Sequence, residues 1–439
     1  MGSSFNYNLA RRIDSWAGPL LCAALFAVSR VHALLGGPPQ PAMRATTPPR
    51  RAPLEPRRIL VIKCYGLGNV VMLLPVLAAL RHGLPQARVD FLTLEEHRAL
   101  LERSGLPSRV IGITLRGFPG VFARLWRALR EVRAGRYDLV IDFEQFVKFS
   151  AAIAYLSGAP ERIGFNTDGQ RRGWLYTKRV VYTDSEHMSR IFARLLRPLA
   201  IDTEPRRVVL DTRPDEEARV DARLAEHGIE AGRFPRIAVH MGSGDNFYRI
   251  PLKRWPIENF AALCDELAKR HGAAILFTGK GAEERELVAT AIAKMTMPAV
   301  DLCDGFSVTE LLAFLKRCHL VIVNDTSVMH IAAAVRTPTV AFFGPTAPLH
   351  YGPGNPEDLV FYRDLHCSPC LTNYNLKVSR CTDPVCVRSI PPDEVLGAVE
   401  KRFLASDAPL RAQLERRPTG PLEAAEAARL APTGSDARE

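Results

Sequence analysis

Uninterrupted apolar runs followed by glycine or polar turns recur through the first half of the chain. The segment RRILVIKCYGLGNVVMLLPVLAALRHGLP opens with such a run, passes through a glycine turn and continues with apolar residues at helical spacing. Further strand-like runs span Val89–Leu94 and Leu139–Phe143, and the alternation continues to about Leu210. Because buried parallel strands are continuous hydrophobic runs whose crossovers are helices, the pattern predicts a parallel sheet with helices on both faces.

The same pattern restarts after a charged, helix-prone segment, Asp215–Gly232. Four later segments each end an apolar run in a small or polar loop: RIAVHMGSG, AAILFTGKG, HLVIVNDTS and TPTVAFFGPT. Ligands of open α/β sheets bind at the carboxyl ends of the strands, so several converging loops predict a nucleotide site. With 439 residues and 47% hydrophobic content, the chain is long enough for two such domains.

These patterns divide the chain into six parts. Residues 38–56 contain seven prolines and are expected to form an extended linker. The end of the chain is rich in Ala, Arg, Glu and Pro without a strong apolar stripe and is expected to be largely disordered. The expected parts are an N-terminal arm (1–37), the linker (38–56), a first α/β domain (57–212), a connecting segment (213–234), a second α/β domain (235–403) and the tail (404–439).

The N-terminal arm combines an apolar run with positive charge. The uncharged part, which starts at Trp16, ends at Arg30, short of the roughly 20 residues that a bilayer span needs. The first 57 residues hold seven arginines against two carboxylates, in a chain of net charge +11. No nucleic-acid-binding motif accompanies this charge, so membrane phosphates are the favoured partner and nucleic acid is not expected. Three interpretations stay open: a signal peptide, a helix packed on the protein, and an interfacial helix or anchor that places Leu20, Leu21, Phe26 and Leu35 in lipid.

Nine cysteines, mostly scattered singly in apolar segments, indicate a reducing cytoplasm. Four of them follow the spacing C-x2-C-x10-C-x4-C in a loop-like stretch: Cys367, Cys370, Cys381 and Cys386. They supply enough ligands for a tetrahedral structural zinc site, and a structural or redox-sensitive thiol cluster fits equally well. A catalytic role for these thiols is not expected.

Two loops after buried strands are candidates for binding an anion. In YGLGN, Gly66, Gly68 and the helix start near Asn69 leave backbone N–H groups free for an anionic partner, although a simple tight turn also explains the glycines. The loop is neither a dinucleotide fingerprint nor a P-loop, because the third glycine and the Gly-Lys-Ser/Thr are missing. In NDTSVMH, Asn324–His330, the polar residues are either helix caps or ligands of a diphosphate at the strand end.

On these motifs the chain resembles glycosyltransferase family 9, the ADP-heptose:lipopolysaccharide heptosyltransferases. The resemblance covers about Arg58 to Ile390 and rests on ILVIKCYGLGNVVMLLPVLAALR, DLVIDFEQ, ERIGF, LKRWP, DTSVMHIAAA and FFGPT. Ser327 replaces the glycine usual in the D-T-G-x-x-H loop of that family. The resemblance implies a GT-B architecture, in which two Rossmann-like, doubly wound domains face a cleft. The acceptor would bind mainly to the first domain and the nucleotide sugar to the second.

The resemblance also implies roles for individual residues. Lys253 of LKRWP would neutralise the donor diphosphate as charge builds on the leaving nucleotide. Glu283 matches an acidic position near the donor ribose, with Glu284 and Glu286 as alternatives. The remaining expected contacts to the phosphates or the sugar come from Ser243, Gly244, Asp325, Thr326, Ser327 and His330.

The implied reaction is inverting transfer that requires no cofactor or metal. The family has an aspartate as proposed base in its opening G-D-V loop, but this chain has Asn69 there, and an amide cannot usefully accept a proton. Three interpretations stay open. Another carboxylate, Asp142 or Glu144, acts as base; the acceptor is activated by positioning alone; or the protein has lost activity.

The resulting expectation is transfer of a sugar, taken to be heptose from ADP-heptose, to a lipopolysaccharide-core-type glycolipid. The enzyme would work on the inner face of the cytoplasmic membrane, held there by its basic arm. The alternatives are a noncatalytic sugar-nucleotide or glycolipid binder and a transferase that uses another nucleoside-diphosphate sugar.

Overall fold

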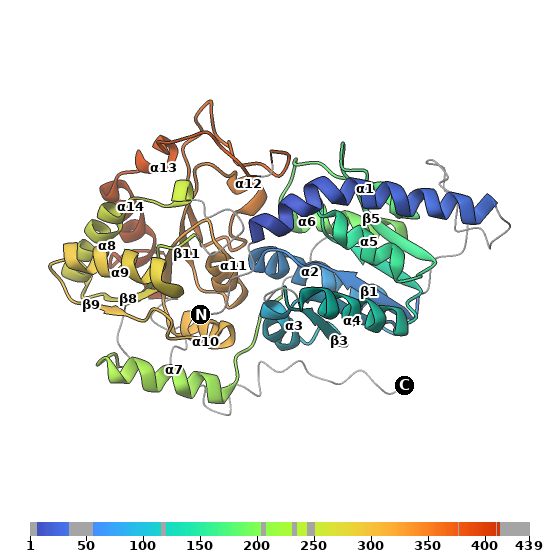
Figure 1. The fold of residues 1–439 in the computed structure, drawn as a ribbon. Coiled ribbons are helices and arrows are strands. Elements are labelled where there is room, and N and C mark those ends of the chain that lie inside the picture. Colours follow the sequence, from blue (N-terminus) through green and yellow to red (C-terminus); the bar gives the residue numbers. More distant parts are fainter. Residues whose placement is uncertain are drawn as a thin grey trace.

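The computed structural model describes residues 7–34, 56–115, 120–202, 208–230, 235–243, 251–375, 377–409 and 411–412. Its core is two separate six-stranded parallel sheets, one from each half of the chain (Figure 1). The predicted α/β class with two doubly wound domains is therefore confirmed. The proline-rich linker and nearly all of the tail lie outside the described residues.

The strands of both sheets are short and largely buried, as their uninterrupted apolar sequences predict. The first sheet has the order β3-β2-β1-β4-β5-β6 and the second β12-β11-β10-β7-β8-β9. The strands of the first sheet are β1 (Arg58–Ile62), β2 (Arg88–Leu94), β3 (Arg109–Ile113), β4 (Leu139–Asp142), β5 (Glu161–Asn166) and β6 (Lys178–Val181). Those of the second are β7 (Arg236–His240), β8 (Ala274–Thr278), β9 (Ala299–Asp301), β10 (Leu320–Asn324), β11 (Thr339–Phe342) and β12 (Leu359–Phe361).

Helices cover both faces of each sheet. Those of the first half are α1 (Tyr7–Leu34), α2 (Leu67–Gly83), α3 (Arg98–Arg103), α4 (Val121–Ala134), α5 (Lys148–Leu156) and α6 (Met188–Ala193), with the short turns η1 (Glu95–His97), η2 (Arg172–Leu175) and η3 (Arg194–Leu199). Those of the second half are α7 (Pro214–Glu226), α8 (Ile257–His271), α9 (Gly281–Lys294), α10 (Val308–Arg317), α11 (Ser327–Ala334), α12 (Pro348–Tyr351), α13 (Val385–Arg388) and α14 (Pro392–Val399), with η4 (Pro251–Lys253) and η5 (Glu400–Leu404). No helix in the described ranges is long and apolar enough to cross a membrane.

The strand orders locate the ligand-binding edge of each sheet. In both sheets the first strand of the domain lies between its second and fourth strands, so the chain reverses direction of winding at β1/β4 and at β7/β10. Loops at such a switch point diverge and leave a crevice at the carboxyl ends of the strands. In this chain the YGLGN loop follows β1 and the DTS loop follows β10, which places each at the switch point of its own sheet.

The N-terminal helix α1 is anchored on the first domain through one face. The Asp14 carboxylate accepts hydrogen bonds from the backbone N–H groups of Lys148 (3.0 Å) and Phe149 (2.8 Å), so it caps the start of α5. Cys22 is fully buried, and the ring of Phe26 lies 5.5 Å from that of Trp174. Of the predicted lipid-facing side chains, Phe26 therefore packs on the protein, whereas Leu20 and Leu21 are exposed and Leu35 lies outside the described residues.

The connecting helix α7 packs on the second domain and also contacts the first. The guanidinium of Arg317 on α10 binds Asp221 (2.7 Å) and Glu217 (3.0 Å) of α7. On the other side of α7, Glu216 forms an ion pair with Arg103 of α3. Helices α2 and α11 also pack against each other, so the amino ends of one helix from each domain meet (Figure 1).

Candidate active site

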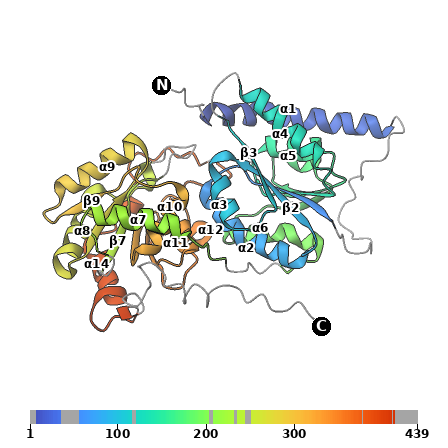
Figure 2. The same cartoon turned by 90° about the horizontal axis from the view of Figure 1, so that it is seen from below.

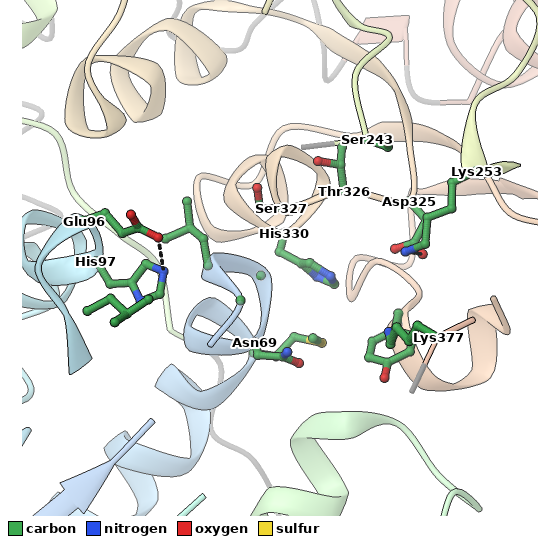
Figure 3. A pocket seen from close by; sticks show the side chains of 16 residues that line it. Asn69, Glu96, His97, Ser243, Lys253, Asp325, Thr326, Ser327, His330 and Lys377 are labelled. Carbon is green, nitrogen blue, oxygen red and sulfur yellow. Dashed lines mark hydrogen bonds and ion pairs between the residues drawn. The ribbon is translucent and has the colours of Figure 1, made fainter. Parts of the chain in front are cut away.

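A pocket lies between the two domains, where the loops from both switch points meet (Figure 3). Its walls come from both halves of the chain, as a cleft between two doubly wound domains requires. The first domain contributes Gly66, Leu67, Gly68, Asn69, Met72, Leu94, Glu96 and His97. The second contributes Ser243, Lys253, Asp325, Thr326, Ser327, His330, Tyr351 and Lys377.

On the first-domain side, the glycine loop presents the start of α2 to the pocket. Gly66 occupies the N-cap position with φ 82°, a left-handed conformation that suits glycine, and no side chain caps the helix. Asn69 lies in the first turn of α2, and its Oδ1 atom is buried without a hydrogen-bond partner among the described residues. The loop thus offers uncapped N–H groups and one unsatisfied acceptor.

On the second-domain side, the DTS loop presents the start of α11. Thr326 is the N-cap residue, but its side chain makes no capping hydrogen bond. The alternative interpretation, in which the polar residues of the DTS loop are helix caps, is thus not supported at Thr326. Because the first N–H groups of the helix and its dipole are directed to the pocket, this end of α11 favours an anion.

Lys253 and Asp325 form an ion pair at the centre of the second-domain wall. The Lys253 Nζ atom lies 2.5 Å from Asp325 Oδ2, and both side chains are only 7% exposed. The Thr346 hydroxyl donates to the same oxygen at 2.6 Å. Burial raises the pKa of Asp325, but the ammonium groups of Lys253 and Lys377, together with the hydrogen bonds from Lys253 and Thr346, bring that pKa below its usual value. Burial lowers the pKa of Lys253, and the Asp325 carboxylate opposes that shift, so each charge stabilises the other.

A buried tryptophan fixes the position of Lys253. Trp255, two residues on, stacks on Phe342 of β11 with ring centroids 4.2 Å apart, and its indole N–H donates to the carbonyl of Ile390. Its backbone N–H donates to Asn324 Oδ1, and the Asn324 amide in turn donates to the carbonyl of Met241. The K-x-W-P motif is thus tied to the end of β10, which explains why Lys253 reaches the DTS loop.

The two histidines of the pocket are neutral at physiological pH. Burial lowers the pKa of His330 to about 4 and, helped by nearby Lys63, that of His97 to about 4. The His330 ring lies against Gly68, where an added Cβ would be only 2.8 Å from its Cδ2 atom. Gly68 is therefore needed for the close approach of α2 to α11, and His330 can offer a hydrogen bond but not a charge.

Asp142 and Glu144 do not line the pocket, contrary to the expectation that one of them reaches the cleft as a base. The Asp142 carboxylate is fully buried and accepts hydrogen bonds from Arg172 (2.8 Å) and the Tyr176 hydroxyl (2.6 Å). Glu144 accepts from the Lys63 ammonium and from the backbone N–H of Cys64, each at 2.8 Å. Glu144 thus supports the segment after β1, Asp142 holds Arg172 and Tyr176, and the oxygens of both carboxylates are occupied within the protein.

The remaining predicted donor residues divide between the pocket and its surroundings. Ser243 lines the pocket, whereas Gly244 lies outside the described residues. Glu283 is exposed, does not line the pocket, and forms an ion pair with Arg254 at 2.7 Å. Glu284 is buried and accepts from the backbone N–H of Lys280 at 2.8 Å. Another alternative, Glu286, is exposed on α9.

Several pocket residues were missed by sequence reasoning. Glu96 and His97 follow β2, so the rule that functional side chains cluster at strand ends could have indicated them. Tyr351 and Lys377 carry no such signal, because Tyr351 ends the short helix α12 and Lys377 lies in the irregular stretch between the cysteines of the motif. Their place in the pocket depends on tertiary packing alone.

The cysteine motif does not assemble a metal site in the described part of the chain, where no group of three or more suitable ligand side chains lies close enough to hold an ion. Cys386 is buried, Cys367 is exposed, and the Cys381 thiol donates to the carbonyl of Asp383 at 3.1 Å. All nine cysteines are free thiols. The structural zinc remains a prediction from spacing that this geometry does not support.

Comparisons with known proteins agree with this arrangement. The model of glycosyltransferase family 9 (heptosyltransferase) matches residues 122–378. The lipooligosaccharide heptosyltransferase 2 of Haemophilus influenzae is 26% identical over 317 residues, which cover 67% of this chain and 85% of that protein.

Two solved structures share the fold. A family 9 glycosyltransferase from Veillonella parvula has a TM-score of 0.68 and 24% identity, covering 80% of this chain and 98% of that one. The E. coli ADP-heptose LPS heptosyltransferase II has a TM-score of 0.61 and 20% identity, covering 78% and 97%. Since the family model spans more than half of the chain, this protein belongs to glycosyltransferase family 9 and is a glycosyltransferase.

Proposed function

We propose that the protein transfers a heptose from ADP-heptose to a hydroxyl of a lipopolysaccharide-core-type glycolipid. The observation that carries this proposal is the meeting of two uncapped helix starts and Lys253 in one interdomain pocket. Such a pocket suits a diphosphate that leaves toward positive charge. The donor and acceptor are those named for similar proteins, the H. influenzae lipooligosaccharide and E. coli LPS heptosyltransferases.

In the proposed reaction, an acceptor hydroxyl on the first-domain side attacks the anomeric carbon of the donor. A new glycosidic C–O bond forms as the bond to the β-phosphate oxygen breaks, and the electron pair leaves with the diphosphate. Attack from the face opposite the nucleotide inverts the anomeric configuration. Lys253 and the start of α11 stabilise the charge that develops on the leaving group, and we assign no metal ion to this step.

The hydroxyl proton needs an acceptor, and neither Asp142 nor Glu144 is free to take it. Glu96 is a carboxylate on the first-domain wall of the pocket, with its side chain about half exposed at 48%. Its Oε1 atom lies 3.8 Å from His97 Nε2 (Figure 3). We propose that Asn69 orients the attacking hydroxyl and that Glu96 receives the proton, directly or through water.

A noncatalytic binder of sugar nucleotides is the second candidate, and one observation favours it. Asn69 stands where the resemblance places the base, and its unsatisfied Oδ1 gives the site an amide instead of a carboxylate. Such a protein would keep the donor side of the pocket intact, including the ion pair of Lys253 with Asp325.

The two candidates are separated by measuring ADP release from ADP-heptose in the presence and absence of a truncated lipopolysaccharide acceptor. We expect release that depends on the acceptor and a glycolipid product of increased mass. A parallel melting series with ADP-, UDP- and GDP-sugars identifies the donor, because a ligand that binds the folded state raises Tm by mass action. A rise in Tm with the donor but no turnover would identify a binder. A larger rise in Tm with a UDP- or GDP-sugar would show that this sugar nucleotide, and not ADP-heptose, is the donor.

We also propose that the first domain rests on an anionic membrane, at the inner face of the cytoplasmic membrane. Helices α1, α4 and α5 cover the same side of the first sheet (Figure 2). On α4, Phe122 and Trp126 are 66% and 63% exposed beside the exposed Arg127 and Arg130. Exposed aromatic rings next to arginines match the chemistry of an anionic lipid interface.

Helix α1 extends this surface with a second apolar stripe. Its Trp16 is 82% exposed and its Leu20, one turn on, 69% exposed, while Asp14 and Cys22 on the other side anchor the helix. If these two helices contact the membrane, an acceptor that is itself a membrane lipid would lie next to the first domain. This proposal deepens the function above without being required for donor binding.

Replacing both Phe122 and Trp126 by serine is expected to reduce binding to vesicles of equal parts phosphatidylcholine and phosphatidylglycerol at least fivefold in a sedimentation assay. The loss follows from removing roughly 1.5–3 kcal/mol of apolar burial per side chain, discounted for partial insertion. Val360→Ser, at an exposed apolar position on β12, is the matched control and should bind as wild type does. Equal binding to pure phosphatidylcholine, or no loss in the double variant, would contradict the proposal.

A further inference from the structure

The cysteine loop, defined as residues 367–386, has no part in the mechanism described above, yet it enters the pocket. Its Lys377 is among the residues that line the cavity (Figure 3), and its ammonium lies over the ring of Tyr351. The spacing of its cysteines predicted only a thiol cluster or a zinc ion. A cation carried into a diphosphate pocket requires a separate explanation.

Lys377 is held in place through its backbone. Its φ of 55° is left-handed, and its N–H donates to the carbonyl of Thr372 (2.9 Å) and to Asn375 Oδ1 (3.0 Å). The Asn375 amide donates in turn to the carbonyl of Cys370 at 2.7 Å. A tight hydrogen-bonded turn therefore positions this lysine, which is unlike a freely moving surface side chain.

Hydrogen bonds and ring contacts fasten the same turn to both domains. Asn373 accepts from the Tyr351 hydroxyl (3.1 Å) and donates to the hydroxyl of Tyr182 (2.7 Å), which belongs to the first domain. The Tyr374 ring packs edge-on against Phe146 with centroids 5.6 Å apart. The turn thus contacts both domains beside the pocket, so the position of Lys377 depends on how the two domains are arranged.

The two pocket lysines, Lys253 and Lys377, differ in whether their ammonium groups already have a direct ion-pair partner. The ammonium of Lys253 is neutralised by Asp325 at 2.5 Å. The Lys377 Nζ atom lies 4.1 Å from the centroid of the Tyr351 ring and has no direct hydrogen bond or ion pair with any residue that the structure describes. Burial lowers the pKa of Lys377, and the more distant carboxylates of Asp325 and Asp184 oppose that shift. A nucleoside diphosphate carries at least two negative charges, more than one already paired lysine can offset.

We propose that Lys377 is a second cationic ligand for the diphosphate of the donor, and that the cysteine loop serves to place it there. Tyr351 supports the ammonium from one side through its ring face, which leaves the N–H donors for the phosphate oxygens. The inference rests on the proposed function, because it requires a nucleoside diphosphate in this pocket. It adds a binding residue and a role for a loop that had none.

The test is the affinity of the full-length protein for ADP and for AMP, measured by calorimetry in wild type and Lys377→Met. We expect ADP binding to weaken about tenfold or more, as for loss of one charged hydrogen bond, and AMP binding to change less than twofold. Lys377→Arg should recover part of the loss. Arg380→Met, an exposed cation on the same loop, is the matched control and should bind ADP normally.

The outcomes separate this inference from the proposed function. Wild-type ADP binding with no loss in Lys377→Met would overturn the role of Lys377 and leave the function intact. Equal weakening for ADP and AMP, or a fall in Tm that accounts for the loss, would make the residue structural. Failure of wild type to bind ADP, UDP, GDP or CDP would overturn both.

Discussion

Lys253→Met is expected to lower turnover of ADP-heptose by a factor of about a hundred to a thousand, the effect of removing one preorganised donor from a developing oxyanion. Lys253 contacts Asp325 in the loop that leads into α11, where we place the leaving diphosphate. It is also buried in an ion pair with Asp325. Loss of one partner leaves an uncompensated buried charge, which costs about 3–5 kcal/mol of folding free energy.

The double variant Lys253→Met/Asp325→Asn separates catalysis from folding. Removing both charges should recover much of the stability lost in the single variant, as measured by the midpoint of urea unfolding, while turnover stays low. Lys294→Met, the same change at an exposed lysine of α9 that pairs with Glu258 and does not line the pocket, serves as the matched control. Turnover within threefold of wild type in a folded Lys253→Met protein would remove Lys253 from the mechanism.

Asn69→Asp is expected to raise acceptor-dependent turnover by about a hundredfold, the lower end of what a positioned general base contributes. The side chain projects from the first turn of α2, where the helix dipole favours a carboxylate, so the variant should fold as wild type does. The Oδ1 atom of the amide is shielded from solvent, and a carboxylate in such surroundings is a stronger base than one in water. Initial rates across pH would reveal the added ionisation.

Introducing Glu96→Gln into the wild type and into the Asn69→Asp variant tests whether Glu96 is the proton acceptor of the natural protein. If Glu96 receives the proton, this change lowers wild-type turnover about tenfold or more and has little effect beside an aspartate at position 69. Asn69→Ala removes the proposed orienting group and should raise KM for the acceptor without altering donor affinity. Activity that appears only in Asn69→Asp would make the natural protein a binder, and unchanged activity in Glu96→Gln would leave positioning as the sole activation.

The features predicted correctly from sequence are those that local pattern encodes. Continuous apolar runs defined the strands, and polar or glycine residues directly after them defined the loops at the carboxyl edge. The family resemblance placed Lys253 at the donor, and the rule that parallel strands end at a common edge placed Asp325 there, before their 2.5 Å contact was known. The same rule wrongly favoured Asp142, since it locates a strand end but not the direction of a side chain.

What the sequence by itself determined is therefore the pair of parallel α/β domains, the family and the donor loop, because each depends on residues close together in the chain. Tertiary structure alone decided three other features. It turned Asp142 inward to Arg172 across 30 residues, brought Lys377 to Tyr351 through a loop without regular structure, and paired Asp14 with the start of α5 more than 130 residues away. These contacts arise from long-range packing and charge pairing, which no periodicity in the chain records.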